Sequence, residues 1–117
     1  MCELKEKKRM RLNDFAEDVH QIAVEHGWWI KPPSFPEVIA LCHSELSEAL
    51  EEYRKGKGAN ETYVIKGAPQ GIPFELADVI LRILDYCGHE GIDIERCLEE
   101  KNNFNRNRTF MHGGKVI

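Results

Sequence analysis

The sequence predicts an all-α protein whose four helices pack as a bundle, and three observations lead to this fold class. Apolar residues recur at three- and four-residue steps in four separate stretches. Proline and glycine divide those stretches, and the alternation typical of strands is nearly absent. A chain of 117 residues can bury one core. We therefore expect residues 1–117 to form a single domain, with residues 1–11 and 109–117 as its tails.

The first helix is expected over residues 13–26, where apolar side chains share one face. Asn13 or Asp14 is the expected N-terminal cap, and Gly27 ends the helix. The residues that follow, up to the two prolines at 32 and 33, are expected to form a loop.

The second helix is expected to begin at Ser34 or Pro36 and to end at Lys55. Ser34 and Glu37 have the spacing of a capping box, and glycines follow the last helical residue. Residues 56–71 then form a long connection, for which the sequence predicts a loop and no defined strand.

The third helix is expected from after Pro73 to about His89, ending at Gly88 or Gly91. The fourth is expected from near Asp93, which can cap it, to about Arg106. Apolar residues cover half or more of the circumference of the third helix, so this helix should be largely buried. One short bundle does not cover so wide an apolar surface, which predicts a homo-oligomer, either a dimer or a tetramer.

Composition and charge exclude several classes of protein. Charged residues make up 31% of the chain and hydrophobic residues 42%, as in globular proteins. The 16 basic and 20 acidic residues give a net charge of −4, which argues against a nucleic-acid-binding face. No apolar run approaches the length of a membrane span, and residues 1–11 lack the apolar stretch of a signal peptide. We expect a cytoplasmic protein with no nucleic-acid or membrane partner.

The cysteines do not indicate a metal site. Cys2, Cys42, Cys87 and Cys97 form no CxxC pair, which argues against a zinc ribbon. The last three lie within apolar helical patterns, so we expect reduced thiols in the core.

Two helices each carry a pair of acidic residues three positions apart. Glu45 and Glu48 lie beside the apolar face of the second helix, and Glu75 and Asp78 lie on the narrow polar stripe of the third. If these stripes face each other, four carboxylates converge and need a counter-charge. Mg²⁺, with Mn²⁺ as a substitute, prefers carboxylate oxygens and retains water for chemistry. The alternative is two solvated helix faces, because a single ExxE is common.

The apolar stripe of the fourth helix becomes basic and amidic toward its end. It continues into Lys101, Asn105 and Arg108, and His112 and Lys115 follow in the tail. Such a cluster of cations matches the oxygens of a phosphate group. The alternative is that the long side chains cover apolar surface while their charges stay in water.

Trp28 and Trp29 stand together in the loop after the first helix. An indole face can stack on a nucleobase, and we take Trp29 as the candidate for that role. The alternative places one tryptophan in the core and the other at a subunit contact.

The order of these motifs resembles that of the MazG-like nucleoside triphosphate pyrophosphohydrolases, a family of small all-α enzymes. The resemblance covers about residues 12–115. Residues 43–49, HSELSEA, read like the first acidic motif of the family, and residues 75–79, ELADV, like the second. Residues 112–115, HGGK, resemble the substrate-binding segment at its C-terminus. The gap between the acidic motifs, residues 49–74, is longer than in compact members.

The resemblance implies an activity and a set of roles. Members of the family hydrolyse the bond between the α- and β-phosphates of a nucleoside triphosphate and release a monophosphate and pyrophosphate. Carried over, Glu45 orients or deprotonates the attacking water, and nothing fixes the base of the substrate. The implied Mg²⁺ ligands are Glu45, Glu48, Glu75 and Asp78, and the implied phosphate-binding residues are Lys101, Asn105, Arg108 and Lys115, with His112 beside them.

Two other readings compete with this one. A di-iron bundle needs ExxH on two helices, and the chain supplies only Glu17 to His20. The alternative function is that of a helical bundle that binds nucleotides or a partner helix without turnover, because the same sequence features fit such a protein.

Overall fold

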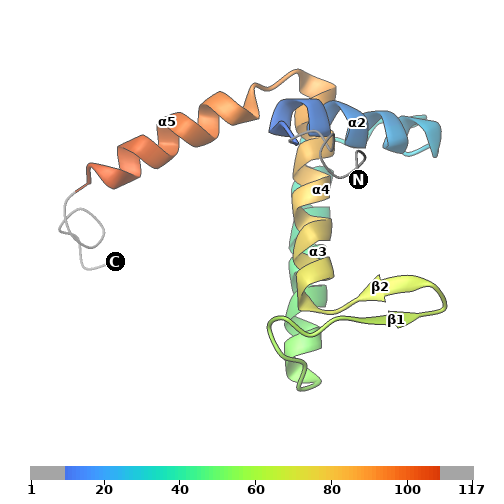
Figure 1. Cartoon of the computed structure of the whole chain (residues 1–117). Coiled ribbons are helices and arrows are strands. Elements are labelled where there is room, and N and C mark those ends of the chain that lie inside the picture. Colours follow the sequence, from blue (N-terminus) through green and yellow to red (C-terminus); the bar gives the residue numbers. More distant parts are fainter. Residues whose placement is uncertain (1–9, 109–117) are drawn as a thin grey trace, which may run out of the picture.

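The computed structural model describes residues 10–108, which form four helices and one β-hairpin (Figure 1). The elements are α2 (Leu12–Glu25), α3 (Phe35–Arg54), β1 (Tyr63–Ile65), β2 (Ala68–Gln70), α4 (Ile72–Glu90) and α5 (Ile94–Arg106). The four predicted helices are confirmed, and their ends lie within two residues of the predicted ones.

Helices α2 and α3 both pack on α4. Helix α4 runs antiparallel beside α3, and α2 crosses over its C-terminal end (Figure 1). The small core lies where α2 meets α4. Its buried residues are Ala16, Leu84 and Cys87, and the apolar side chains packed against them are Leu12, Phe15 and Ile94.

The crossing of α2 and α4 is close because residue 88 has no side chain. A Cβ added at Gly88 would lie 2.5 Å from the carbonyl oxygen of Ala16 and 2.8 Å from the Cβ of His20. Helix α4 passes through Gly88 and ends at Gly91, whose φ of 70° is the left-handed conformation that favours glycine. Of the two ends proposed for this helix, the later one is therefore confirmed.

The three predicted helix caps have different outcomes. The cap of α5 is confirmed, since the Arg96 amide donates to the Asp93 side chain at 3.1 Å. The capping box of α3 is confirmed, since the Glu37 amide donates to Ser34 Oγ at 3.3 Å and the Ser34 amide donates to Glu37 at 2.8 Å. The cap of α2 at Asn13 or Asp14 is wrong, because the residue before the helix makes no side-chain cap bond. The side chain of Asn13 instead donates to Asp93 at 2.9 Å and links α2 to the start of α5.

The connection between α3 and α4 contains a hairpin, where the sequence predicted a loop. Strand β1 pairs antiparallel with β2 around a turn at Lys66 and Gly67, which have φ values of 51° and 82°. Two residues with positive φ are typical of the type I′ hairpin turn. The Tyr63 hydroxyl donates at 2.6 Å to Glu52, a buried residue of α3. This hydrogen bond attaches the hairpin to α3.

Replacing Tyr63 by phenylalanine should lower the urea midpoint of unfolding, because the buried Glu52 carboxylate loses its donor. The same bond raises the pKa of Tyr63 from 10.0 to about 12. Its contribution to stability is therefore complete below pH 10 and is lost as the pH rises through about 12. Tyr53→Phe, at a position 69% exposed, is the control. Equal midpoints for the two variants would contradict the attachment.

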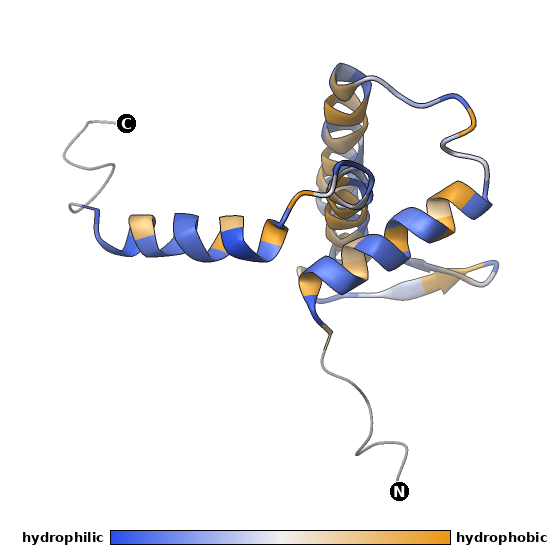
Figure 2. Ribbon diagram, turned by 90° about the horizontal axis from the view of Figure 1, so that it is seen from above, coloured by the Kyte–Doolittle hydropathy of each residue, from blue (hydrophilic) through white to orange (hydrophobic). Residues whose placement is uncertain are grey.

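Helix α5 leaves the other helices instead of packing along them. Figure 2 shows it running away from α2, α3 and α4, and no residue of α5 is buried. Leu98 and Phe104 are 51% and 59% exposed, so the predicted inward stripe of this helix is not covered within one chain. The radius of gyration is 17.4 Å, against about 13 Å for a compact chain of this length.

Helices α3 and α4 also leave apolar side chains uncovered. The prediction that the third helix is largely buried is wrong for one chain, since only Leu84 and Cys87 of α4 are buried. The exposed apolar side chains recur at helical spacing on both helices. They are Phe35, Ile39, Leu46, Leu50 and Tyr53 on α3, and Phe74, Leu76, Ile80 and Ile83 on α4.

Two of the three described cysteines are buried as predicted. Cys42 and Cys87 are free thiols in the interior, whereas Cys97 is exposed, because α5 packs against the core only at its first residue, Ile94. Cys2 lies outside the described residues. Between residues 10 and 108, no helix combines the length and the hydropathy that crossing a bilayer requires.

Candidate metal and phosphate site

Three of the four predicted acidic ligands come together. One carboxylate oxygen each from Glu45, Glu75 and Asp78 lies within 4.8 Å of the other two. Glu45 comes from α3, and Glu75 and Asp78 lie one turn apart on α4. The two acidic stripes therefore face each other across the antiparallel pair of helices, which is the arrangement that convergence of the carboxylates requires.

The proximity of these carboxylates changes their acidity. Burial first, and then the charges of Asp78 and Glu48, raise the pKa of Glu75 above its ordinary value. Burial and the charge of Glu45 raise the pKa of Asp78, which the Arg82 guanidinium partly offsets. Ionising both groups therefore destabilises the fold, and this penalty grows as the pH rises from the ordinary carboxyl pKa through the raised ones.

Glu48 and Glu52 occupy the next two turns of the same α3 stripe. Glu48 is exposed and outside the group of three, although it lies near enough for its charge to act on Glu75. Glu52 is turned to the Tyr63 hydroxyl. The predicted fourth ligand thus lies beside the cluster and does not complete it.

The cluster suits a hard divalent cation. All its donors are oxygens, the ligands that Mg²⁺ and Mn²⁺ prefer. Oxygens on opposite sides of an Mg²⁺ ion lie about 4.2 Å apart, twice the usual bond length. The three oxygens here lie within 4.8 Å of one another, so enclosing an ion needs only small side-chain adjustments. Three carboxylates leave several positions of an octahedral ion for water and substrate oxygens.

A pocket opens beside the cluster. It has a volume of about 780 Å³ and lies between α2, the loop after it, α3 and α4. Glu45, Asp78 and Arg82 line it together with Trp28 and Tyr86. Pockets of about 300–1,000 Å³ commonly hold a small organic ligand. The pocket therefore combines carboxylates, one guanidinium and aromatic faces.

Arg82 is paired with the acidic cluster. Its Nε donates to a carboxylate oxygen of Glu45 at 2.8 Å, and the two side chains are 29% and 18% exposed. Its guanidinium also lies 5.7 Å from the centre of the Trp28 ring. Arg82 thus connects the cluster to the aromatic part of the pocket.

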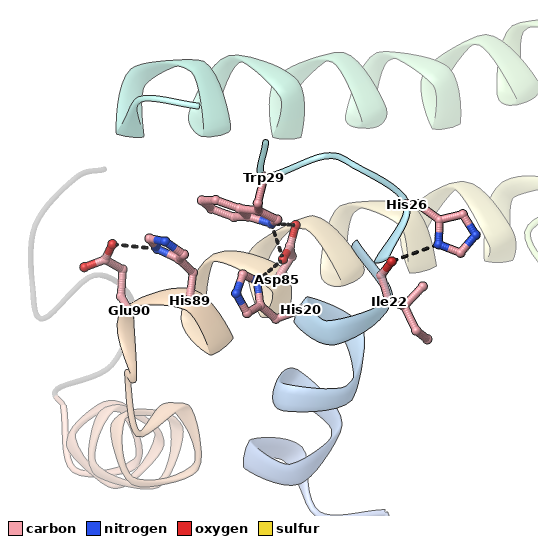
Figure 3. Close-up of polar contacts among 7 residues, drawn as sticks. All are labelled: His20, Ile22, His26, Trp29, Asp85, His89 and Glu90. Carbon is pink, nitrogen blue, oxygen red and sulfur yellow. Dashed lines mark hydrogen bonds and ion pairs between the residues drawn. The ribbon is translucent and has the colours of Figure 1, made fainter. Parts of the chain in front are cut away.

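The loop after α2 is anchored on α4 through Trp29 (Figure 3). The Trp29 indole N–H donates to the Asp85 carboxylate at 3.0 Å, and His20 Nδ1 donates to the same carboxylate at 2.8 Å. The Trp29 ring is stacked on His89, with centroids 4.0 Å apart and planes 10° apart. Trp29 lines the pocket, but one of its faces is taken by a residue of its own chain.

Trp28 is the more exposed of the two tryptophans. It is 62% exposed and lines the same pocket. Of the two indoles, it presents the larger free surface to a planar ligand. The geometry therefore gives less support to Trp29, the stacking residue expected from the sequence, than to Trp28.

The predicted phosphate-binding residues of the fourth helix are not at this site within one chain. Lys101 and Asn105 on α5, and Arg108 just after its end, are exposed and do not line the pocket. The charged groups of Lys101 and Arg108 lie 5.0 and 5.9 Å from the ring of Phe104 on α5. His112 and Lys115 lie outside the described residues.

Arg82 and Asp85 are the site residues that the sequence interpretation passed over. Both lie on the polar stripe of α4 that carries Glu75 and Asp78. The polar stripe of α4 is the sequence signal that points to Arg82, because a guanidinium one turn beyond an acidic pair can reach the same acidic cluster. What the pattern does not give is the side chain on α3 with which Arg82 pairs.

Adding Mn²⁺ should raise the melting temperature at neutral pH, because the ion relieves the repulsion among the three carboxylates. The shift should shrink near about pH 5, where protons compete for the ligands. Glu75→Gln should melt higher than the wild type without metal and lose the Mn²⁺ shift. Glu51→Gln, on the exposed side of α3, is the control. Equal Mn²⁺ shifts in both variants would remove Glu75 from the site.

Comparisons of the chain with protein-family models, with curated proteins and with solved structures gave no match. The chemistry assigned to the site therefore rests on its own geometry.

Proposed function

We propose that the protein is a Mg²⁺-dependent hydrolase that converts nucleoside triphosphates to the monophosphate and pyrophosphate. The observation that carries the proposal is the convergence of Glu45, Glu75 and Asp78 at the edge of a pocket that also holds Arg82 and Trp28. A polyphosphate needs cations, and an attached nucleoside needs a planar apolar surface. The resemblance to the MazG-like family points to the same reaction.

In this proposal the acidic residues bind the metal and activate water, and Trp28 binds the base. Glu45, Glu75 and Asp78 would hold Mg²⁺, which would neutralise phosphate oxygens and lower the pKa of a bound water. Glu48, one turn along α3, would add its negative charge beside them. Glu45 also orients or deprotonates the attacking water. Trp28 stacks on the base, and its exposed ring sets no base preference by hydrogen bonding.

The test is a panel of ribo- and deoxynucleoside triphosphates, canonical and modified, assayed for release of both pyrophosphate and monophosphate with Mg²⁺. Mn²⁺ should substitute, and excess chelator should abolish turnover. Turnover that survives the chelator would overturn the metal role. Nucleotide binding without pyrophosphate release from any member of the panel would favour the alternative, a non-catalytic nucleotide-binding bundle.

The homo-oligomer belongs to this proposal. The exposed apolar side chains of α3, α4 and α5 are the surfaces that a second copy would cover, and α5 would then complete a bundle outside its own chain. Lys101, Asn105 and Arg108 would reach the pocket of that second copy. Light scattering at micromolar concentration is the measurement, and a fully active monomer would contradict the assembly.

A further inference from the structure

We propose that Arg82 is a phosphate-binding residue of the pocket, which Glu45 holds in place until the substrate arrives. The inference rests on the proposed function and adds to it a phosphate ligand supplied by the same chain as the acidic cluster. The position of the residue is the starting point. Arg82 lines the pocket between the cluster and the exposed ring of Trp28. A nucleotide with its base on Trp28 and its phosphates at the metal ions would pass this guanidinium.

The hydrogen-bonding capacity of Arg82 supports the role. A guanidinium carries five N–H donors, and here one of them, on Nε, is given to Glu45. The side chain is 29% exposed, so it is accessible from the pocket. The fork of a guanidinium matches two oxygens of one phosphate group. Arg82 can therefore keep its bond to Glu45 and still present donors to a phosphate.

The charges of the site also support a phosphate-binding role for Arg82. Without a ligand, Arg82 is the cation paired with a cluster of three carboxylates. Once divalent ions neutralise those carboxylates, the guanidinium is no longer needed to balance Glu45. Its charge is then available to the polyphosphate, which brings several negative charges into a partly buried pocket. The competing role is purely positional, in which Arg82 only orients Glu45 toward the metal.

Calorimetric titration with tripolyphosphate in the presence of Mg²⁺ separates these roles, because this probe has phosphates and no base. Arg82→Met should weaken tripolyphosphate binding at least tenfold, while Mn²⁺ binding measured without phosphate stays within about threefold of the wild type. Arg82→Lys keeps the charge but not the forked donors, so its tripolyphosphate affinity should lie between those of the wild type and Arg82→Met. Arg54→Met, on the exposed end of α3, is the matched control and should bind like the wild type.

The outcomes separate this inference from the proposed function. Unchanged tripolyphosphate affinity in both Arg82 variants, or no tripolyphosphate binding by the wild type, would overturn the phosphate role. Weakened Mn²⁺ binding that fully accounts for the lost phosphate affinity would assign Arg82 to positioning Glu45 and would also overturn it. If no nucleotide is hydrolysed but tripolyphosphate binding still depends on Arg82, the inference stands and the hydrolase proposal fails. Should Arg82→Met not fold, Arg82→Lys decides.

Discussion

Replacing Glu45 by glutamine is expected to lower kcat/KM for the best nucleoside triphosphate by at least about 100-fold. Glutamine keeps the shape of the side chain and an oxygen that can accept from Arg82, but it loses the negative charge and the basic oxygen. The loss should appear mainly in kcat, because Glu45 is assigned to the attacking water as well as to the metal. Steady-state pyrophosphate release is the measurement.

The matched control for Glu45 is Glu51→Gln on the same helix, whose side chain is 52% exposed and pairs only with Arg54 at 3.9 Å. It should retain wild-type kinetics. Circular dichroism should show the same helical content in both variants. A Glu45→Gln protein with wild-type helicity and kcat/KM within about threefold of the wild type would remove Glu45 from catalysis.

Gly88→Ala should lower the free energy of unfolding by on the order of 2 kcal/mol, although alanine is the better helix former. The added Cβ would meet the Ala16 carbonyl oxygen at 2.5 Å, and a backbone atom inside α2 cannot move aside alone. The two helices must separate, and the small core around Leu84 loses packing. Urea unfolding monitored by circular dichroism measures the change.

Gly58→Ala is the control for this substitution, because the nearest atoms to its added Cβ lie 3.9 Å away in the loop after α3. It should unfold at the wild-type midpoint. Separating α2 from α4 also pulls His20 from Asp85, so Gly88→Ala should alter the near-ultraviolet signal of Trp29. An unfolding midpoint at or above the wild-type value would show that the crossing is not tight.

The elements and the acidic pairs could be predicted from sequence because both are set by local spacing. Periodicity shows which residues share a helix face, so it places Glu45 on the stripe of α3 and Glu75 with Asp78 on that of α4. That the two stripes meet is seen only in the structure. The capping box at Ser34 is equally local. These features depend on residues three or four positions apart.

The remaining features depend on how the helices meet, which the spacing does not specify. The amphipathic pattern of α5 predicts one covered face, but it does not predict that α5 extends away from the other helices of its chain (Figure 2). For the same reason Lys101 was placed at the acidic cluster and is not there within one chain. The hairpin was missed because its strands have three residues each, too few for a visible alternation. The pairing of Arg82 with Glu45 joins residues 37 positions apart.

The isolation of α5 has a consequence for amide hydrogen exchange. A helix of 13 residues with no buried side chain is marginal in water, so its amides should exchange almost as fast as those of a frayed end. Amides of α4, packed between α2 and α3, should exchange only on global unfolding. The protection of the α5 amides therefore reports whether another molecule covers this helix. If that protection rises with protein concentration while the protection of the α4 amides is unchanged, the rise in α5 protection measures the free energy of covering α5.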